Sequence, residues 1–125
     1  MKNMYYKLFG LVMILSLLSL PAWAANHKTI TATELKTRLA TKNFFLLDVH
    51  IPEQAHIHGT DAFIDFRKIR QSTPKLPSDK ETEIVVYCLG GGMSRAAAED
   101  LQEMGYTNVY DLEGGIHAFN RLLSK

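Results

Sequence analysis

The sequence contains a single cysteine, Cys88, and the residues around it could make its thiol reactive. Cys88 ends the strand-like run 83–88 (EIVVYC), and three glycines (90–92) follow before a helical pattern begins near Ser94. Glycines expose their backbone and adopt positive φ, so a short turn of this kind can direct several N–H groups at one point beside a helix N-terminus. An anionic sulfur would be stabilised there by the amides and by the helix dipole. We therefore predict a thiolate-rich, nucleophilic Cys88 at neutral pH.

A solitary cysteine also restricts the alternatives. It excludes an intramolecular disulfide and a metal site built on several thiolates. A cysteine that serves only as a small buried apolar side chain is the plain alternative. Three histidines, His50, His56 and His58, raise a metal hypothesis, but no acidic or thiol ligand at a recognisable interval completes a ligand set. We expect no metal and no organic cofactor, and we expect these histidines to make ordinary solvent or backbone contacts.

The first 24 residues are typical of a signal peptide that is removed on export. Two lysines precede the uncharged apolar stretch 8–20, and an Ala-Trp-Ala motif ends at residue 24. The stretch is shorter than the roughly 20 residues of a membrane helix and is followed by Pro21, so an uncleaved anchor is the less favoured alternative. The sequence thus predicts one domain over residues 25–125, a periplasmic location and no stable membrane insertion after cleavage. Exported proteins usually pair their thiols or avoid them, which favours a chemical role for the lone Cys88.

Composition and charge place the chain among small globular domains. Its 125 residues are 46% hydrophobic and 22% charged, with a net charge of +1. Taking Lys2 and Lys7 from the 14 basic residues leaves 12 against 13 acidic ones for the remaining chain. The charges are scattered without long runs of one sign. Electrostatics therefore predicts neither nucleic acid nor a charged membrane surface as a partner.

Strand-like and helix-like patterns alternate along the chain. Strands are predicted at 44–49, 62–65, 83–88 and 108–112, and helices at 32–41, 94–104 and 116–123, with a helical turn and loop at 67–82. Thr31 and Glu34 have the spacing of a capping box at the first helix. This alternation predicts an α/β fold with a mostly parallel central sheet flanked by helices, and with ligands at the carboxyl ends of the strands.

The segment 85–119 resembles the single-domain rhodanese-like sulfurtransferases in its succession of strand, cysteine, Gly-containing loop, Ala-rich helix, Gly-Tyr-x-Asn-Val strand and Gly-Gly-x-x-Ala-aromatic ending. A second signature upstream, spanning 47–59, resembles the same family. The resemblance implies a small rhodanese-like α/β domain with thiosulfate sulfurtransferase activity. In that chemistry, a Cys88 persulfide carries a sulfane sulfur from a donor such as thiosulfate to a thiophilic acceptor, which is cyanide in assays.

The resemblance also assigns site residues. Cys88 takes the place of the persulfide-bearing nucleophile. The loop whose backbone would hold the sulfur corresponds to Leu89, Gly90, Gly91, Gly92, Met93 and Ser94. Ser94 is in addition the candidate N-cap of the following helix, and Arg95 either attracts an anionic donor or is merely solvated. The implied partners are a small anionic sulfur donor and a thiol, cyanide or protein acceptor.

The chain departs from the family pattern at several positions. Met93 stands where many family members carry an arginine, so the loop itself has no positive side chain and thiosulfate affinity is left open. His50 follows Asp48-Val49 where an arginine is usual, which predicts a different shape of the pocket rim. Asp48 is expected to serve a structural hydrogen bond. Two further functions are considered: a non-catalytic sulfur-carrier or partner-binding module, and a related cysteine phosphatase. The phosphatase would need an arginine six positions after the cysteine, where this chain has Ser94.

Overall fold

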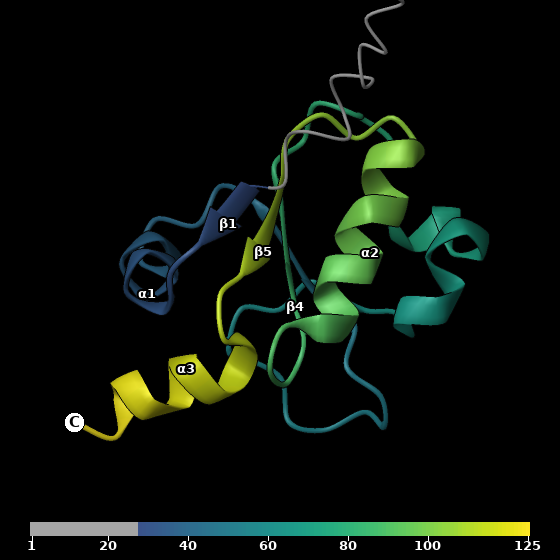
Figure 1. Ribbon diagram of the computed structural model, residues 1–125. Coiled ribbons are helices and arrows are strands. Elements are labelled where there is room, and N and C mark those ends of the chain that lie inside the picture. Colours follow the sequence, from purple (N-terminus) through teal and green to yellow (C-terminus); the bar gives the residue numbers. More distant parts are fainter. Residues whose placement is uncertain (1–27) are drawn as a thin grey trace, which may run out of the picture.

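The computed structural model describes residues 28–125, and Figure 1 shows their arrangement. The strands are β1 (Lys28–Ile30), β2 (Phe45–Asp48), β3 (Ala62–Phe63), β4 (Ile84–Tyr87) and β5 (Val109–Leu112). The α-helices are α1 (Ala32–Leu39), α2 (Gly92–Glu103) and α3 (Gly115–Leu123), and two 3₁₀ turns, η2 (Phe66–Gln71) and η3 (Thr73–Lys75), lie between β3 and β4.

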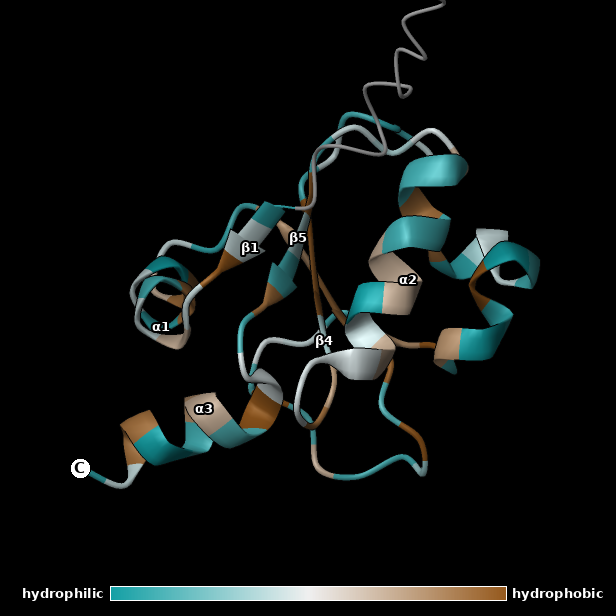
Figure 2. Ribbon diagram, in the orientation of Figure 1, coloured by the Kyte–Doolittle hydropathy of each residue, from teal (hydrophilic) through white to brown (hydrophobic). Residues whose placement is uncertain are grey.

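The five strands form one parallel sheet in the order β1-β5-β4-β2-β3. Helices α1 and α3 cover one face, while α2 and η2 cover the other (Figure 1). The hydrophobic colours in Figure 2 gather on the central strands, whereas the helices also carry hydrophilic residues. This arrangement confirms the predicted α/β class with a central parallel sheet between helices.

Side-chain alternation along β4 sends its residues to both layers. Val85 and Tyr87 belong to the core beneath α1 and α3, whereas Ile84 and Val86 belong to the core beneath α2. Because successive side chains of a strand point to opposite faces, Cys88, the residue after β4, continues the second set. The thiol is thereby directed towards α2.

The local sequence signals and the observed elements agree closely at α1. Thr31 Oγ1 accepts the Glu34 N–H at 3.1 Å, and Glu34 Oε2 accepts the Thr31 N–H at 3.4 Å. The capping box is confirmed, although the helix ends at Leu39, two residues before the predicted end. The sequence patterns missed β1, which has only three residues and is held by parallel pairing with β5.

The predicted signal peptide and the domain start at residue 25 lie outside the described residues. Across residues 28–125, no helix has both the length and the apolar character needed to cross a membrane.

Candidate active site

Cys88 lies directly after β4, at the carboxyl end of the sheet, and is 2% exposed. Its side chain packs in the core beneath α2, and its Sγ accepts the Gly91 N–H at 3.0 Å. The sequence predicts several loop amides around the thiol. Among the described residues, the only amide that donates to Sγ is that of Gly91. The sulfur therefore lies at the base of the loop, between the apolar core and the first turn of α2.

The glycine loop is shorter than predicted, because α2 begins at Gly92 and not near Ser94. Gly91 is the N-cap, with φ of 121°, a conformation that favours glycine and closes the turn within three residues of the cysteine. The Gly91 carbonyl accepts the Arg95 N–H at 3.1 Å. The prediction that Ser94 caps the helix is therefore wrong, since Ser94 is already the third helical residue.

Ser94 instead points inward, where it is fully buried between the loop and β5. Its Oγ lies 3.4 Å from Cys88 Sγ and 3.1 Å from the Gly91 carbonyl oxygen, and it hydrogen-bonds to Asp111 Oδ1. Asp111 belongs to β5 and is 4% exposed. No role was predicted for Asp111 from the sequence, although an acid inside an otherwise apolar strand, near its carboxyl end, was the available sign.

The N-terminus of α3 holds the other end of the loop. The Ile116 N–H donates to the Cys88 carbonyl at 2.8 Å, and the His117 N–H donates to the Leu89 carbonyl at 3.2 Å. Gly115 allows this approach: its φ is 58°, and a Cβ at this position would lie 2.5 Å from the carbonyl oxygens of Cys88 and Leu89. The contact of Gly115 with the cysteine loop was not predicted from the sequence.

The remaining predicted residues lie in the loop itself and in the first turns of α2. Leu89 and Met93 are half-buried, and Met93 packs against the core beneath α2. Gly90 and Arg95 are exposed and line a pocket of about 370 Å³, together with Asp111 and Glu113. The structure thus brings the eight predicted residues, 88–95, to one end of β4, where the sheet and α2 meet.

A second polar cluster lies at the carboxyl end of β2, around the buried Asp48. Asp48 Oδ1 accepts the His50 N–H at 3.0 Å, and Oδ2 lies 2.6 Å from His56 Nδ1. His56 Nε2 lies 2.9 Å from Glu53 Oε1. The hydrogen bond to Asp48, with a further one to Glu53, raises the pKa of His56 above its ordinary value. The structural role predicted for Asp48 fits these contacts, whereas the ordinary solvent or backbone contacts predicted for His56 are wrong.

No three His, Cys, Asp or Glu side chains of the part of the chain that the structure describes are grouped as metal ligands. Both nitrogens of His56 are hydrogen-bonded to carboxylates, which suits a protonated ring that donates twice. The imidazole of His56 thus joins Asp48 to Glu53 through two hydrogen bonds.

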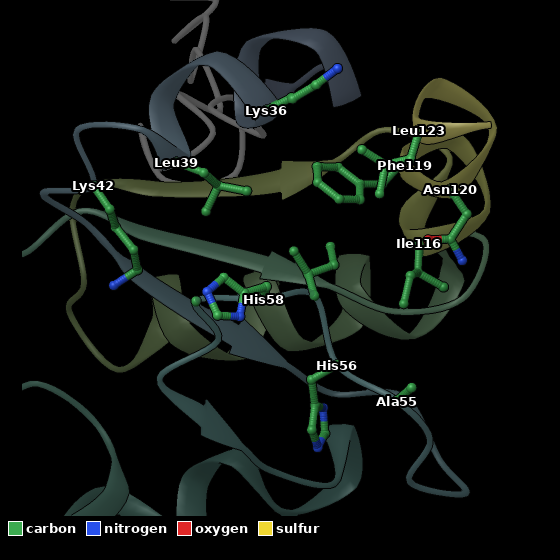
Figure 3. A pocket seen from close by; sticks show the side chains of 12 residues that line it. Lys36, Leu39, Lys42, Ala55, His56, His58, Ile116, Phe119, Asn120 and Leu123 are labelled. Atoms are coloured by element: carbon green, nitrogen blue, oxygen red, sulfur yellow. The ribbon is translucent and has the colours of Figure 1, made fainter. Parts of the chain in front are cut away.

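A larger pocket of about 520 Å³ lies on the opposite face of the sheet from the thiol, between α1, α3 and the segment 55–59 (Figure 3). Its wall is mainly apolar and includes Phe119, and Lys42 lies at its rim (Figure 3). The Lys42 ammonium is paired with Asp61 Oδ2 at 2.6 Å. The pocket is separate from the cysteine loop and from the predicted site residues.

The rhodanese-like domain family model matches residues 31–122 of the chain. Thiosulfate sulfurtransferase PspE of Escherichia coli (strain K12) is 31% identical over 108 residues, which are 84% of this chain and 86% of the relative. A tRNA uridine(34) hydroxylase of Erwinia tasmaniensis is 38% identical over 49% of this chain and 17% of its own length.

Solved structures share the fold. A rhodanese-related protein from Thermoplasma volcanium superposes with a TM-score of 0.65 at 27% sequence identity, covering 77% of this chain and 93% of the other. The family match spans most of the chain, including β4, the cysteine loop and nearly all of α3. The protein therefore belongs to the rhodanese-like domain family.

Proposed function

We propose that this protein is a sulfurtransferase that carries a sulfane sulfur on Cys88. The Cys88 thiolate attacks the outer sulfur of a donor such as thiosulfate. The sulfur–sulfur bond of the donor breaks, sulfite leaves with the electron pair, and a Cys88 persulfide remains. A nucleophilic acceptor then attacks the outer sulfur, and the Cys88 thiolate is the leaving group. With cyanide as acceptor, the product is thiocyanate.

The observation that carries the proposal is the 3.0 Å hydrogen bond from the Gly91 N–H to Cys88 Sγ at the start of α2. It supports an anionic sulfur at this position, because a preorganised amide stabilises charge without a competing protonatable group. Gly92 and Met93 occupy the first turn of α2, where backbone N–H groups have no partner within the helix. These two amides are suited to hold the terminal sulfur of the persulfide.

The donor is proposed to be small and anionic. Arg95 is exposed beside the loop and is the one basic side chain among residues 88–95, so it is placed to attract such a donor. Thiosulfate is the donor named for the 31% identical relative. The limited exposure of Cys88 favours small donors and acceptors, with a thiol or cyanide as acceptor. Residues 1–24 support a periplasmic location for this reaction.

The proposal is tested on purified protein in two steps. Incubation with thiosulfate followed by intact mass measurement is expected to show one added sulfur atom, which Cys88→Ser abolishes. Addition of cyanide is then expected to remove that sulfur and release thiocyanate in equal amount. Because serine is close to cysteine in size, Cys88→Ser should remain folded, and circular dichroism checks this.

Two other outcomes would redirect the assignment. A stable persulfide that no small acceptor removes would indicate a sulfur carrier or partner-binding module. Hydrolysis of phosphate esters without persulfide formation would indicate a phosphatase and would contradict the proposal. The position six residues after the cysteine disfavours that last outcome, since Ser94 cannot clamp phosphoryl oxygens as an arginine does.

A further inference from the structure

The buried Ser94 hydroxyl has a single proton and three neighbouring acceptors, Cys88 Sγ, the Gly91 carbonyl oxygen and Asp111 Oδ1. Its Oγ is 3.4 Å from Cys88 Sγ on one side and is hydrogen-bonded to Asp111 Oδ1 on the other. A serine hydroxyl donates one hydrogen bond and accepts through its lone pairs. The Gly91 carbonyl oxygen, 3.1 Å from Ser94 Oγ, is also an acceptor, but it is neutral and is shared with the Arg95 N–H. A carboxylate at Asp111 and a thiolate at Cys88 are the two neighbours of the hydroxyl that can carry a negative charge, so these two decide its orientation.

An ionised Asp111 wins this competition. Hydrogen bonds to a charged acceptor are roughly twice as strong as neutral ones, and this bond lies in a buried site where it is little screened. Once the Ser94 proton is directed to Asp111, Ser94 Oγ presents a lone pair to Cys88 Sγ. A lone pair accepts the S–H of a neutral thiol, but it repels a thiolate.

We propose that Asp111 is a positioning residue that acts on Cys88 through Ser94. It orients the hydroxyl so that Ser94 stabilises the neutral thiol of the sulfur-free protein, and this effect opposes the stabilisation of the thiolate by the Gly91 N–H. In the persulfide, the charge rests on the outer sulfur, about 2.0 Å beyond Sγ, so the same lone pair opposes it less. The statement about the persulfide rests on the proposed sulfur transfer, whereas the effect of Asp111 on the free thiol does not.

Other charged and titratable groups lie around this end of the sheet on the neighbouring elements: Arg95 on α2, Glu113 after β5, His117 on α3, and Asp48 and His50 at the end of β2. The first three are exposed, so water and salt screen their charges. Asp48 is engaged by the His50 N–H and by His56. Within residues 28–125, the ionisable side chains that hydrogen-bond to Ser94 Oγ are those of Cys88 and Asp111.

The test is the pH dependence of Cys88 alkylation by iodoacetamide, in which the thiolate displaces iodide and the thiol proton passes to solvent. Each profile is normalised to its own plateau at high pH, so that differences in access cancel. Asp111→Asn keeps the shape of the side chain but removes its charge, and the new amide can donate to Ser94 Oγ. The hydroxyl can then turn to the sulfur. We expect the midpoint to move to lower pH by at least about half a unit, a threefold change in the thiolate-to-thiol ratio.

A double-mutant cycle separates action through Ser94 from a direct effect of the Asp111 charge. In the Ser94→Ala background, Asp111→Asn is expected to give no further shift. An equal shift in that background, no shift in Asp111→Asn, or a shift to higher pH would each overturn the proposal. Circular dichroism establishes that each variant is folded.

Should Asp111→Asn fail to fold, Ser94→Ala decides alone. It removes the acceptor of the thiol proton and the lone pair that opposes the thiolate, so its midpoint is expected at lower pH. A midpoint at higher pH would mean that the hydroxyl donates to the thiolate and would overturn the proposal. Alkylation needs no sulfur donor, so these results stand whether or not the thiocyanate assay supports sulfur transfer.

Discussion

Two buried carboxylates flank β4 near the carboxyl end of the sheet, Asp48 on β2 and Asp111 on β5. Both are less than 5% exposed. Asp48 is bonded to the imidazole of His56 and to the backbone N–H of His50, so it joins the strand end to the segment that follows. Asp111 is bonded to the Ser94 hydroxyl, which also faces the thiol.

The comparison shows that residue type and strand position do not define the role of a buried acid. Asp48 is hydrogen-bonded to His56, whose other ring nitrogen is hydrogen-bonded to Glu53, and these contacts fix the segment after β2 to the end of that strand. Asp111 is hydrogen-bonded to a neutral hydroxyl that lies beside the proposed nucleophile, Cys88. We therefore call the cluster of Asp48, His50, Glu53 and His56 the holding site, because its hydrogen bonds fix the chain. Asp111 belongs instead to the reactive site, because its hydrogen-bonding partner Ser94 contacts the thiol of Cys88.

The largest effect is expected from Gly115→Ala, which tests whether backbone contacts with α3 hold the cysteine loop. The new Cβ would lie 2.5 Å from the carbonyl oxygens of Cys88 and Leu89, and φ is 58°. Backbone strain costs about 1–2 kcal/mol, and displacement of the loop adds to it, so we expect a loss of about 3 kcal/mol in the free energy of unfolding. Urea denaturation followed by circular dichroism measures it.

Gly105→Ala is the matched control, because Gly105 also has a positive φ, 98°, but a Cβ there would meet no atom within 4 Å. We expect a loss of about 1 kcal/mol from backbone strain alone. Equal losses in the two variants would show that the approach of α3 to the loop contributes nothing to stability.

Much of the fold could be predicted because its signals are local. The capping box at Thr31 and the apolar runs of β2 and β4 are contained within a few residues each, and the alternation of elements then implies a parallel sheet. The short β1 carries no such pattern, since its place depends on pairing with β5, which begins near residue 109. This strand forms because the folded chain brings it beside β5, and no local pattern in the sequence predicts that pairing.

The sequence predicted the cysteine loop but not the hydrogen bond that joins it to β5. Residues 88–95 are contiguous, so their sequence indicates the turn and the helix that follows. The bond between Ser94 and Asp111 joins side chains 17 positions apart on different elements, and no spacing rule connects them. Likewise, the start of α2 was misplaced because the hydroxyl of Ser94 matches an N-cap preference that the positive φ of Gly91 overrides.

A smaller effect is expected at the holding site from Asp48→Ala. The change leaves the His50 N–H without its acceptor and removes the carboxylate from His56. A lost buried hydrogen-bonding partner costs about 1–3 kcal/mol, and we expect about 2 kcal/mol by urea denaturation. Glu53→Gln is the control, since Glu53 is exposed and its loss should cost about 0.5 kcal/mol or less. A loss in Asp48→Ala no larger than in Glu53→Gln would contradict the holding role.

The smallest effect is the pH dependence contributed by His56. The hydrogen bond to Asp48, followed by that to Glu53, raises the pKa of His56 above 6.5 in the folded protein. Its stabilisation is therefore fully present below pH 6.5 and is lost as the pH rises through the raised folded-state value. Because the ring is one-third exposed, we expect less than about 1 kcal/mol.

The measurement compares the free energy of unfolding at pH 6 and pH 8 in the wild type, His56→Gln and His58→Gln. The wild type and His58→Gln are expected to lose stability over this interval by an amount that His56→Gln lacks, because the exposed His58 has no carboxylate partner in the described structure. Should His56→Gln lose as much as the wild type, the charge of His56 would not contribute to the holding site. Asp48 would then stabilise the fold through the His50 N–H alone. The two acids would then differ only in that Asp48 accepts a hydrogen bond from a backbone N–H and Asp111 accepts one from a side-chain hydroxyl.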